Sequence, residues 1–232
     1  MKPPIAVLLL VLCAQINTSA QSCNPYFSIR EGVKSTYEFY NGKGKVTSRN
    51  INYFKDVTGS GSSLSATMVM DIIDVKKNEV ISSGSSKWHC ENGVVRFEIS
   101  PMNVEGVDMS NGGIEASVDG DEMEIPSNLE PGQTLKDINY HVTMTMGGLK
   151  MMDRNFMVKN RKVESAENVT TTAGTFECIK MTYTTESTGR GGNTTKPTQS
   201  GIWYAKDVGV VKSENYKDGK VTSSQLLVKL EQ

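Results

Sequence analysis

The stretch YEFYNGKGKVTSRNINYFKDV, residues 37–57, carries the pattern that decides the fold. Aromatic and polar residues alternate up to Tyr40, an Asn-Gly-Lys-Gly turn follows, and apolar residues alternate again from Val46 to Val57. Phe54 is out of phase, as a twisted or bulged strand allows. Two alternating runs joined by a glycine turn predict a β-hairpin. The stretch YKDGKVTS, residues 216–223, is nearly the same and predicts a second hairpin near the end of the chain.

Alternation with period two continues between glycine turns through the rest of the chain. Further strands are predicted at residues 65–73, 80–88, 94–99, 140–146, 150–163, 176–184, 201–205, 210–216 and 221–230. No segment after the first twenty residues keeps the periodicity of a helix. Residues 101–137 are rich in Gly, Pro, Asn and acidic residues, which predicts an irregular connection containing a short strand or two.

These patterns predict an all-β fold with little helix after the first twenty residues. We expect one strongly curved antiparallel sheet, or a half-open barrel, built from two β-meanders at residues 33–100 and 138–231. Residues 21–232 form a single β-rich domain in this interpretation, and they are numerous enough to bury one sizeable core.

The first twenty residues have the features of a signal peptide. Lys2 supplies a positive start, residues 5–13 are apolar, and Thr18-Ser19-Ala20 offers small residues for cleavage before Gln21. We therefore expect an exported protein, periplasmic or extracellular, and no later segment is apolar enough for a transmembrane helix. Lipid attachment at Cys13 is the less favoured alternative, because Leu12 stands where an attachment site has a small residue.

Composition argues against several classes of function. The formal net charge is -1 and the chain contains only 2 His, so neither nucleic-acid binding nor histidine-based catalysis is expected. The sequence lacks a Gly-x-Ser-x-Gly elbow, a His-Glu-x-x-His pair, a Cys-x-x-Cys pair and a glycine-rich dinucleotide motif. We expect a non-catalytic protein without a cofactor. A hydrolase with two paired carboxylates stays open, because spatial pairing is not visible in a sequence.

Three cysteines follow the predicted signal peptide, namely Cys23, Cys90 and Cys178. An odd number in an exported protein favours one disulfide and one free thiol. Three pairings are possible. We favour Cys90 with Cys178, because both lie in or beside predicted strands whereas Cys23 precedes the first strand.

Methionines gather around one predicted turn: five of the 12 lie at positions 144, 146, 151, 152 and 157. Methionine packs adaptably in apolar space, so we predict a concave sheet face that binds a lipid-like ligand through Met144, Met146, Met151, Phe156 and Trp203. A scaffold whose interior is filled by its own side chains is the alternative. A less favoured alternative is a Cu(I) site made of His141, Met144, Met146 and Met151, because thioethers and imidazole suit that ion.

Several motifs resemble the TapB-like family of exported bacterial proteins of unknown function. The most distinctive are PSNLEPGQTL at residues 126–135, AGTFEC at 173–178 and WYAKDVG at 203–209, and the resemblance covers nearly all of the chain after the signal peptide. The family is similar to envelope proteins with curved sheets, some of them half-open barrels that carry lipid. The resemblance implies that fold and compartment and no settled activity, and it supplies no catalytic residues. From the predicted concave face we expect an apolar small molecule or lipid as ligand, or an envelope protein as partner.

Overall fold

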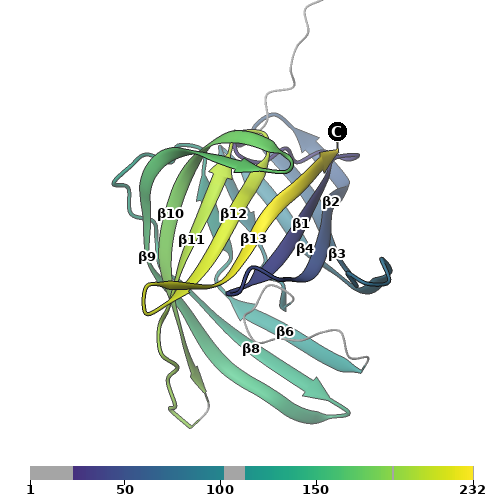
Figure 1. Ribbon diagram of the computed structural model, residues 1–232, viewed down its shortest axis with the longest axis vertical. Coiled ribbons are helices and arrows are strands. Elements are labelled where there is room, and N and C mark those ends of the chain that lie inside the picture. The colour runs from purple at the N-terminus through teal and green to yellow at the C-terminus, as the bar shows by residue number, and fades with distance from the viewer. Residues whose placement is uncertain (1–22, 102–112, 190, 232) are drawn as a thin grey trace, which may run out of the picture.

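The computed structural model describes residues 23–101, 113–189 and 191–231, and it shows one antiparallel sheet of 13 strands curled into a half-barrel (Figure 1). The prediction of an all-β fold is confirmed. The predicted signal peptide and Cys13 lie outside the described residues. The strands are β1 (Lys34–Asn41), β2 (Val46–Ser60), β3 (Ser63–Ile73), β4 (Val80–Glu91), β5 (Val94–Phe97), β6 (Ile114–Gly120), β7 (Met123–Pro126), β8 (Ile138–Met146), β9 (Leu149–Thr171), β10 (Gly174–Gly189), β11 (Thr198–Ala205), β12 (Gly209–Lys217) and β13 (Lys220–Glu231).

The strand order is β6-β8-β9-β10-β11-β12-β13-β1-β2-β3-β4-β5-β7. The first and last long strands pair with each other, for example at Lys34 with Glu231 and at Tyr40 with Ser224. The two hairpins of nearly identical sequence, β1–β2 and β12–β13, are therefore neighbours in the sheet. This β1–β13 pairing joins the two meanders into one sheet.

A short link connects the two edges of the sheet. β6 and β7 are the outermost strands at opposite edges, yet β6 ends at Gly120 and β7 begins at Met123. Gly120 has φ +133°, and a Cβ there would lie 2.5 Å from the carbonyl oxygen of Asn139. Only glycine fits this close approach without strain. The link brings the edges together, so the sheet curls back on itself at this point.

Chain segment 132–135 continues the closure next to β9. The amide of Leu135 donates to the carbonyl of Arg161 at 2.8 Å, and the amide of Val163 donates to the carbonyl of Gln133 at 2.9 Å. The Arg161 side chain then spans the remaining gap from inside, donating at 2.8 Å to the backbone carbonyls of Lys136 and of Glu124 on β7.

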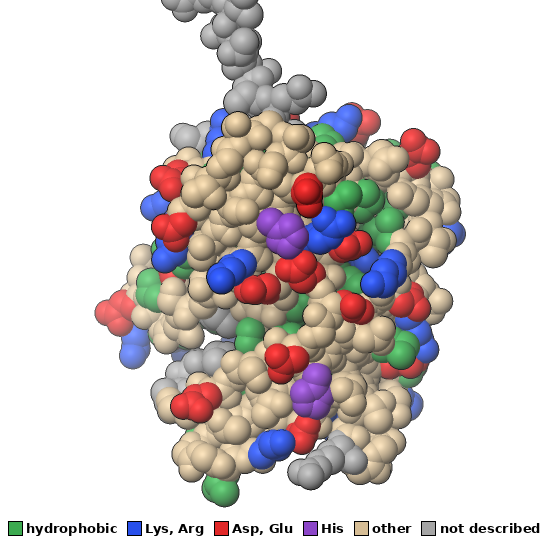
Figure 2. Space-filling view, turned by 180° about the vertical axis from the view of Figure 1, so that it is seen from behind, with side chains coloured by type: hydrophobic (Ala, Val, Ile, Leu, Met, Phe, Trp, Pro, Cys, Tyr) green, Lys and Arg blue, Asp and Glu red, His purple; other side chains and the backbone are tan. Residues whose placement is uncertain are grey.

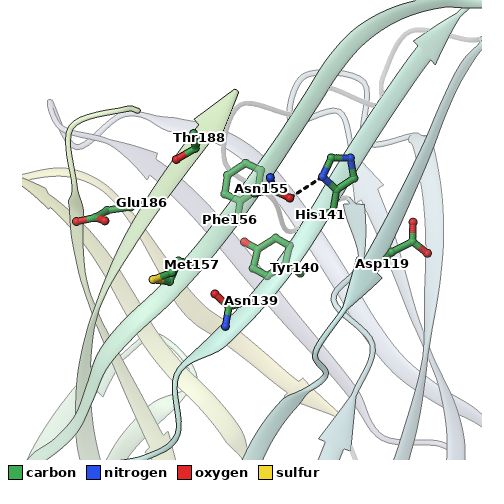
Figure 3. Close-up of a pocket in the computed structure, with 9 residues that line it drawn as sticks. All are labelled: Asp119, Asn139, Tyr140, His141, Asn155, Phe156, Met157, Glu186 and Thr188. Atoms are coloured by element: carbon green, nitrogen blue, oxygen red, sulfur yellow. Dashed lines mark hydrogen bonds between the residues drawn. The ribbon is translucent and has the colours of Figure 1, made fainter. Parts of the chain in front are cut away.

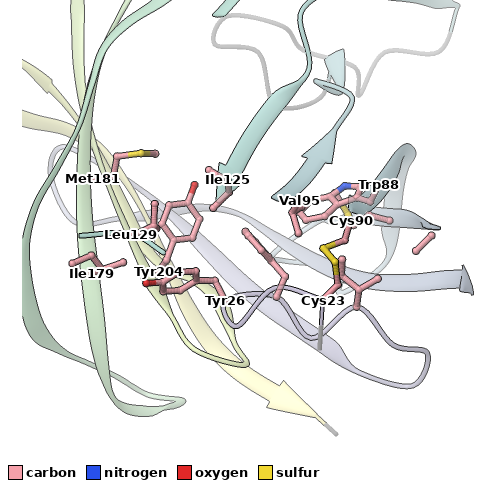
Figure 4. Close-up of a cluster of buried hydrophobic side chains, with 14 of the residues drawn as sticks. Cys23, Tyr26, Trp88, Cys90, Val95, Ile125, Leu129, Ile179, Met181 and Tyr204 are labelled. Atoms are coloured by element: carbon pink, nitrogen blue, oxygen red, sulfur yellow. A yellow bond between two sulfur atoms is a disulfide. The ribbon is translucent and has the colours of Figure 1, made fainter. Parts of the chain in front are cut away.

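The main core fills the end of the half-barrel that we call the closed end, where the turns β2–β3, β4–β5 and β11–β12 lie (Figures 1 and 4). Its buried members are Cys23, Tyr26, Phe27, Ile29, Ala66, Met68, Met70, Trp88, Cys90, Val95, Ile125, Leu129, Val163, Ile179, Met181 and Tyr204. The segment 23–29 enters this core before β1 begins. The ring of Phe27 meets Trp88 and Tyr204 edge-on, with centroids 5.3 and 5.8 Å apart. The Asn24 amide fixes the segment by donating to the carbonyl of Gly93 at 2.9 Å.

The disulfide joins Cys23 to Cys90, so the predicted pairing of Cys90 with Cys178 is wrong. Cys90 faces the main core, whereas Cys178 packs on the opposite, outer face of the sheet and is free. Segment 23–29, which enters the core, brings Cys23 next to Cys90, and strand periodicity cannot predict this contact.

A second, smaller layer covers part of the outer face. The tip of the β9–β10 hairpin folds across β11, β12 and β13, as Figure 1 shows, and the Thr172 hydroxyl donates to the carbonyl of Val228 on β13 at 3.0 Å. The cluster beneath it contains Val169, Cys178, Trp203, Ala205 and Val211. β9 exceeds the predicted strand because residues 164–171 form this cover, whereas β10 exceeds it mainly at the other end, at residues 185–189.

Candidate functional site

The candidate site is the part of the sheet that flares away from the closed end. We call it the flap, and it comprises β6, β8, residues 149–158 of β9 and residues 184–189 of β10 (Figure 1). Its inner face continues the face that carries the main core. The flap has its own apolar cluster: Val142, Met144 and Phe156 are buried, and Ile99, Ile114, Ala116, Val118, Tyr140 and Met152 are half-buried against them.

Strand register explains how this cluster forms. Met144 pairs with Met152 and Tyr140 pairs with Phe156 across β8 and β9, so these four side chains share one face. The rings of Tyr140 and Phe156 stack, with centroids 5.1 Å apart and planes at 4°. The inner-face residues of the edge strand β6, such as Ala116, stay partly exposed because no described strand lies beyond them.

Two of the five residues predicted to bind an apolar ligand come together, namely Met144 and Phe156. Met146 and Met151 lie at the β8–β9 turn, where they are 43% and 61% exposed. Trp203 lies in the outer cluster, under the cover of the β9–β10 hairpin, and its indole donates to the Glu167 carboxylate. The structure therefore places only part of the predicted set on the flap.

The Trp203 ring lies between two lysines. The Nζ atoms of Lys180 and Lys212 are 4.8 and 4.5 Å from its ring centroid. Such cation–π contacts hold the ring in place rather than offer it to a ligand. Tyr204, the next residue, faces the main core, as expected for adjacent strand residues.

The structure does not bring the proposed Cu(I) ligands together. His141 alternates onto the outer face, where its Nδ1 is 2.8 Å from Asn155 Oδ1 and its Nε2 is 2.9 Å from Asp153 Oδ1. Met144 points to the inner face with the buried cluster. Imidazole and thioether thus lie on opposite sides of β8.

An open hollow of about 370 Å³ surrounds His141 on the outer face of the flap (Figure 3). It is lined by Asp119, Asn139, Tyr140, His141, Asn155, Phe156, Met157, Glu186 and Thr188. Most of these are outer-face side chains, and Glu186 is ion-paired with Lys159 at 2.8 Å. A second open hollow of about 500 Å³ spans β9 to β12, also with mostly outer-face side chains, such as Lys162, Lys180 and Tyr216. Most of the side chains that line the two hollows lie on the outer face, although Tyr140 and Phe156 in the first hollow also belong to the inner apolar cluster.

The acidic residues at the link between the sheet edges each have a basic partner. Asp121 lies 3.8 Å from Lys136, and Glu122 lies 3.6 Å from His89. Figure 2 shows both histidines of the chain on one face, among acidic and basic side chains. Within the described residues, no group of three or more His, Cys, Asp and Glu side chains is arranged to hold a metal ion.

Arg161 is a buried charged residue that the sequence interpretation missed. It is 1% exposed, its Nε has no hydrogen-bond partner, and burial lowers the pKa of its guanidinium from the ordinary value. The signal was an arginine two residues before Val163, within an alternating strand where an apolar residue is expected. Because its guanidinium donates to the backbone carbonyls of Lys136 and Glu124, we assign it to closure of the sheet rather than to ligand binding.

The free thiol has no sign of activation. Cys178 is 1% exposed, and burial raises its pKa to about 11. A thiol with this pKa stays protonated at neutral pH and is a poor nucleophile.

The fold and flap define a class of curled antiparallel half-barrels with a filled closed end and a flared apolar face. The chain belongs to the DUF3108-like family, whose profile matches residues 30–227. This match does not carry the TapB-like name, so membership of the TapB-like family stays a prediction. No curated protein matches the chain.

Two solved structures share the fold. One is a protein from Bacteroides fragilis NCTC 9343 that is inferred to be exported and has a YmcC-like fold, with a TM-score of 0.74 and 21% identity. The other is an inferred lipoprotein from Parabacteroides distasonis ATCC 8503, with a TM-score of 0.70 and 21% identity. Each comparison covers 90% of this chain and 100% of the other chain. None of the described residues belongs to a helix long and apolar enough to cross a membrane.

Proposed function

We propose that this protein is an exported, non-catalytic protein of the bacterial envelope that binds an acyl chain or a similar apolar group on the inner face of the flap. The description of the two structural relatives as an exported protein and a lipoprotein supports the envelope location. The inferred ligand rests on one observation, the separate apolar cluster of the flap.

Partial exposure of that cluster supports ligand binding there. Ile114, Ala116, Val118 and Met152 are half-buried, in contrast to the fully covered Val95 and Ile125 of the main core. Unbranched, polarisable methionine side chains adapt to a flexible chain without specific polar contacts. Covering this face with an acyl chain removes apolar surface from water, which stabilises the complex by about 25 cal/mol per Å² buried.

The chemistry of the candidate nucleophiles supports a non-catalytic role. The thiol of Cys178 has a pKa raised to about 11 by burial, and both ring nitrogens of His141 already contact Asn155 and Asp153. A general base needs a free nitrogen within reach of a proton to be abstracted.

A scaffold without a small ligand is the second candidate, and the main core favours it. Segment 23–29 and the inner faces of β3, β4, β10 and β11 fill the closed end with their own side chains. In this alternative the flap packs against an envelope protein instead of an acyl chain.

Titration with 11-(dansylamino)undecanoic acid tests the proposal, using residues 21–232 without vesicles. We expect dansyl fluorescence to rise on binding, and Met152→Gln to weaken binding about five-fold or more, because it places an amide on the apolar face. Met157→Gln is the matched control, since Met157 lies on the outer face and is 43% exposed.

Native mass spectrometry of protein purified from its own envelope then weighs any bound lipid directly. A saturable probe signal that Met152→Gln weakens and Met157→Gln leaves unchanged supports the flap as the site. No saturable binding, or equal weakening by both variants, would sink the acyl-chain proposal and leave the scaffold.

A further inference from the structure

The two ends of the half-barrel differ in their exposed apolar side chains. Strands alternate in direction, so the turns β1–β2, β3–β4, β8–β9, β10–β11 and β12–β13 lie at the end opposite the closed end, which we call the open end (Figure 1). Eight large apolar side chains are exposed in the part of the chain that the structure describes: Val75, Val80, Ile81, Met146, Leu149, Met151, Met157 and Val221. All except Met157 lie at or beside open-end turns.

The two most exposed of them, Leu149 and Met151, lie at the β8–β9 turn together with Met146. Leu149 is 72% exposed, Met151 is 61% exposed and Met146 is 43% exposed. Gly147 and Gly148 have φ +56° and +79°, and no atom lies within 4 Å of a Cβ built at either position. This turn therefore projects into open space, a shape that suits insertion into a soft surface better than contact with a flat, rigid one.

The charges of the two ends also differ. At the open end, segments 41–46, 74–81, 146–151, 191–198 and 217–221 contain eight lysines and three carboxylates, a net charge of +5. At the closed end, turn segments 60–63, 91–94, 171–174 and 205–209 contain one lysine and two carboxylates, a net charge of -1. Asp153 pairs with one open-end lysine, Lys150, at 2.9 Å and leaves the end basic. The whole chain has a net charge of -1, so the basic charge is concentrated where the apolar side chains are exposed.

We propose that the open end binds the surface of an anionic phospholipid bilayer, with Met146, Leu149 and Met151 entering the headgroup region. Exposed apolar side chains among lysines are the combination that binds anionic membrane interfaces, since insertion buries apolar area and the lysines attract the lipid charge. The flap has its apolar inner face beside this turn, so membrane contact would bring acyl chains to it. The membrane contact itself does not depend on acyl-chain binding by the flap.

Co-sedimentation of residues 21–232 with lipid vesicles tests the proposal. Vesicles of phosphatidylcholine alone are compared with vesicles of equal phosphatidylcholine and phosphatidylglycerol. We expect several-fold more protein bound to the anionic vesicles at low salt, with binding falling as salt rises. Met146→Ser is expected to weaken binding about three-fold or more, and Lys77→Gln about five-fold.

Matched variants away from the open end provide the controls. Met157→Ser removes a methionine of the same 43% exposure from the outer face of the flap, and Lys206→Gln removes a lysine from the closed end. Both are expected to bind anionic vesicles as the unchanged protein does. Absence of binding to anionic vesicles at low salt, or equal weakening by the controls, overturns the proposal. The acyl-chain titration contains no vesicles, so each proposal can fail without the other.

Discussion

Arg161 holds the two edges of the curled sheet together from inside. It reaches from β9 to the carbonyl of Glu124 on β7, an edge strand. Among the described residues, no strand pairs with β7 on its outer edge. Its two charge-assisted bonds satisfy the backbone carbonyls of Lys136 and Glu124 on either side of the gap. A buried arginine therefore supplies hydrogen bonds at the sheet edge, where no neighbouring strand would make them.

We predict that Arg161→Met lowers the free energy of unfolding by about 2–4 kcal/mol, because two backbone carbonyls lose their charged donor while the side-chain volume is largely kept. Arg96→Met is the matched comparison. Arg96 contacts the carboxylate of the same Glu124 at 2.6 Å, but that pair is partly exposed, and its loss is expected to cost under about 1 kcal/mol. Urea unfolding followed by tryptophan fluorescence measures both. Equal losses would contradict a special role for Arg161.

The N-terminal segment 23–29 behaves as an element of the core although it is not a strand. It is held by the Cys23–Cys90 disulfide, by the Asn24 side chain, and by the backbone bond from Asp207 to Pro25 at 2.7 Å. These contacts close the upper end in Figure 1 over the side chains of β4 and β11.

We predict that the double variant Cys23→Ser/Cys90→Ser is less stable by about 4 kcal/mol, as chain entropy gives for a cross-link spanning 67 residues. Thiol titration of unreduced protein provides an independent check. One thiol, Cys178, is expected to react per chain of residues 21–232 in denaturant, and almost none in the folded protein at pH 8, because burial raises the thiol pKa to about 11. A Cys178 that fails to react in denaturant would contradict the pairing.

At the scale of elements, periodicity predicted strands well and faces poorly. The β1–β2 hairpin follows directly from residues 37–57, because alternation and turn chemistry are local. Alternation also separates Trp203 from Tyr204, but it does not tell which face a second layer covers. That layer depends on the β9–β10 hairpin folding across β13, a contact between residues 56 positions apart. Long-range folding of this kind leaves no mark in a window of ten residues.

The candidate site shows the same limit. Met144 and Phe156 share one face, because the Gly147-Gly148 turn sets the register of β8 and β9, and their role in ligand binding stays a prediction. Met151 precedes Met152, which faces the inner cluster opposite Met144, so alternation places Met151 on the other face; Met151 is also the extra residue where the register shifts. The predicted set combined residues of both parities on one strand, which cannot all share a face.

For the molecule as a whole, buried tyrosines predict loss of stability at alkaline pH. Tyr37 is 5% exposed, its hydroxyl donates to the carbonyl of Val210 at 2.9 Å, and burial raises its pKa to about 12. The unfolded chain loses this proton near pH 10 and the folded protein near pH 12, so the stabilisation is complete below pH 10 and is lost as pH rises toward 12. The total is about 2–3 kcal/mol.

The comparison is between the unchanged protein and Tyr37→Phe in urea at pH 8, 10 and 11. The variant is expected to be less stable by about 1 kcal/mol at pH 8, where it lacks one hydrogen bond, and to lose less stability between pH 10 and 11. Parallel loss in both proteins over that interval would show that Tyr37 ionisation does not contribute. Tyr204, whose pKa burial also raises, supplies part of the remaining slope.

The pairing of β1 with β13 has a consequence for the order in which the chain can fold. β1 has β2 on one side and β13 on the other. The centre of the sheet therefore cannot be completed until β13, the last strand in the sequence, has been synthesised. Contacts between the two ends of a sequence form slowly, since a long loop must close first. In the proposed exported protein, which would cross a membrane from its N-terminus, β13 would be the last strand to emerge, so the β1–β13 pairing would form only on the far side.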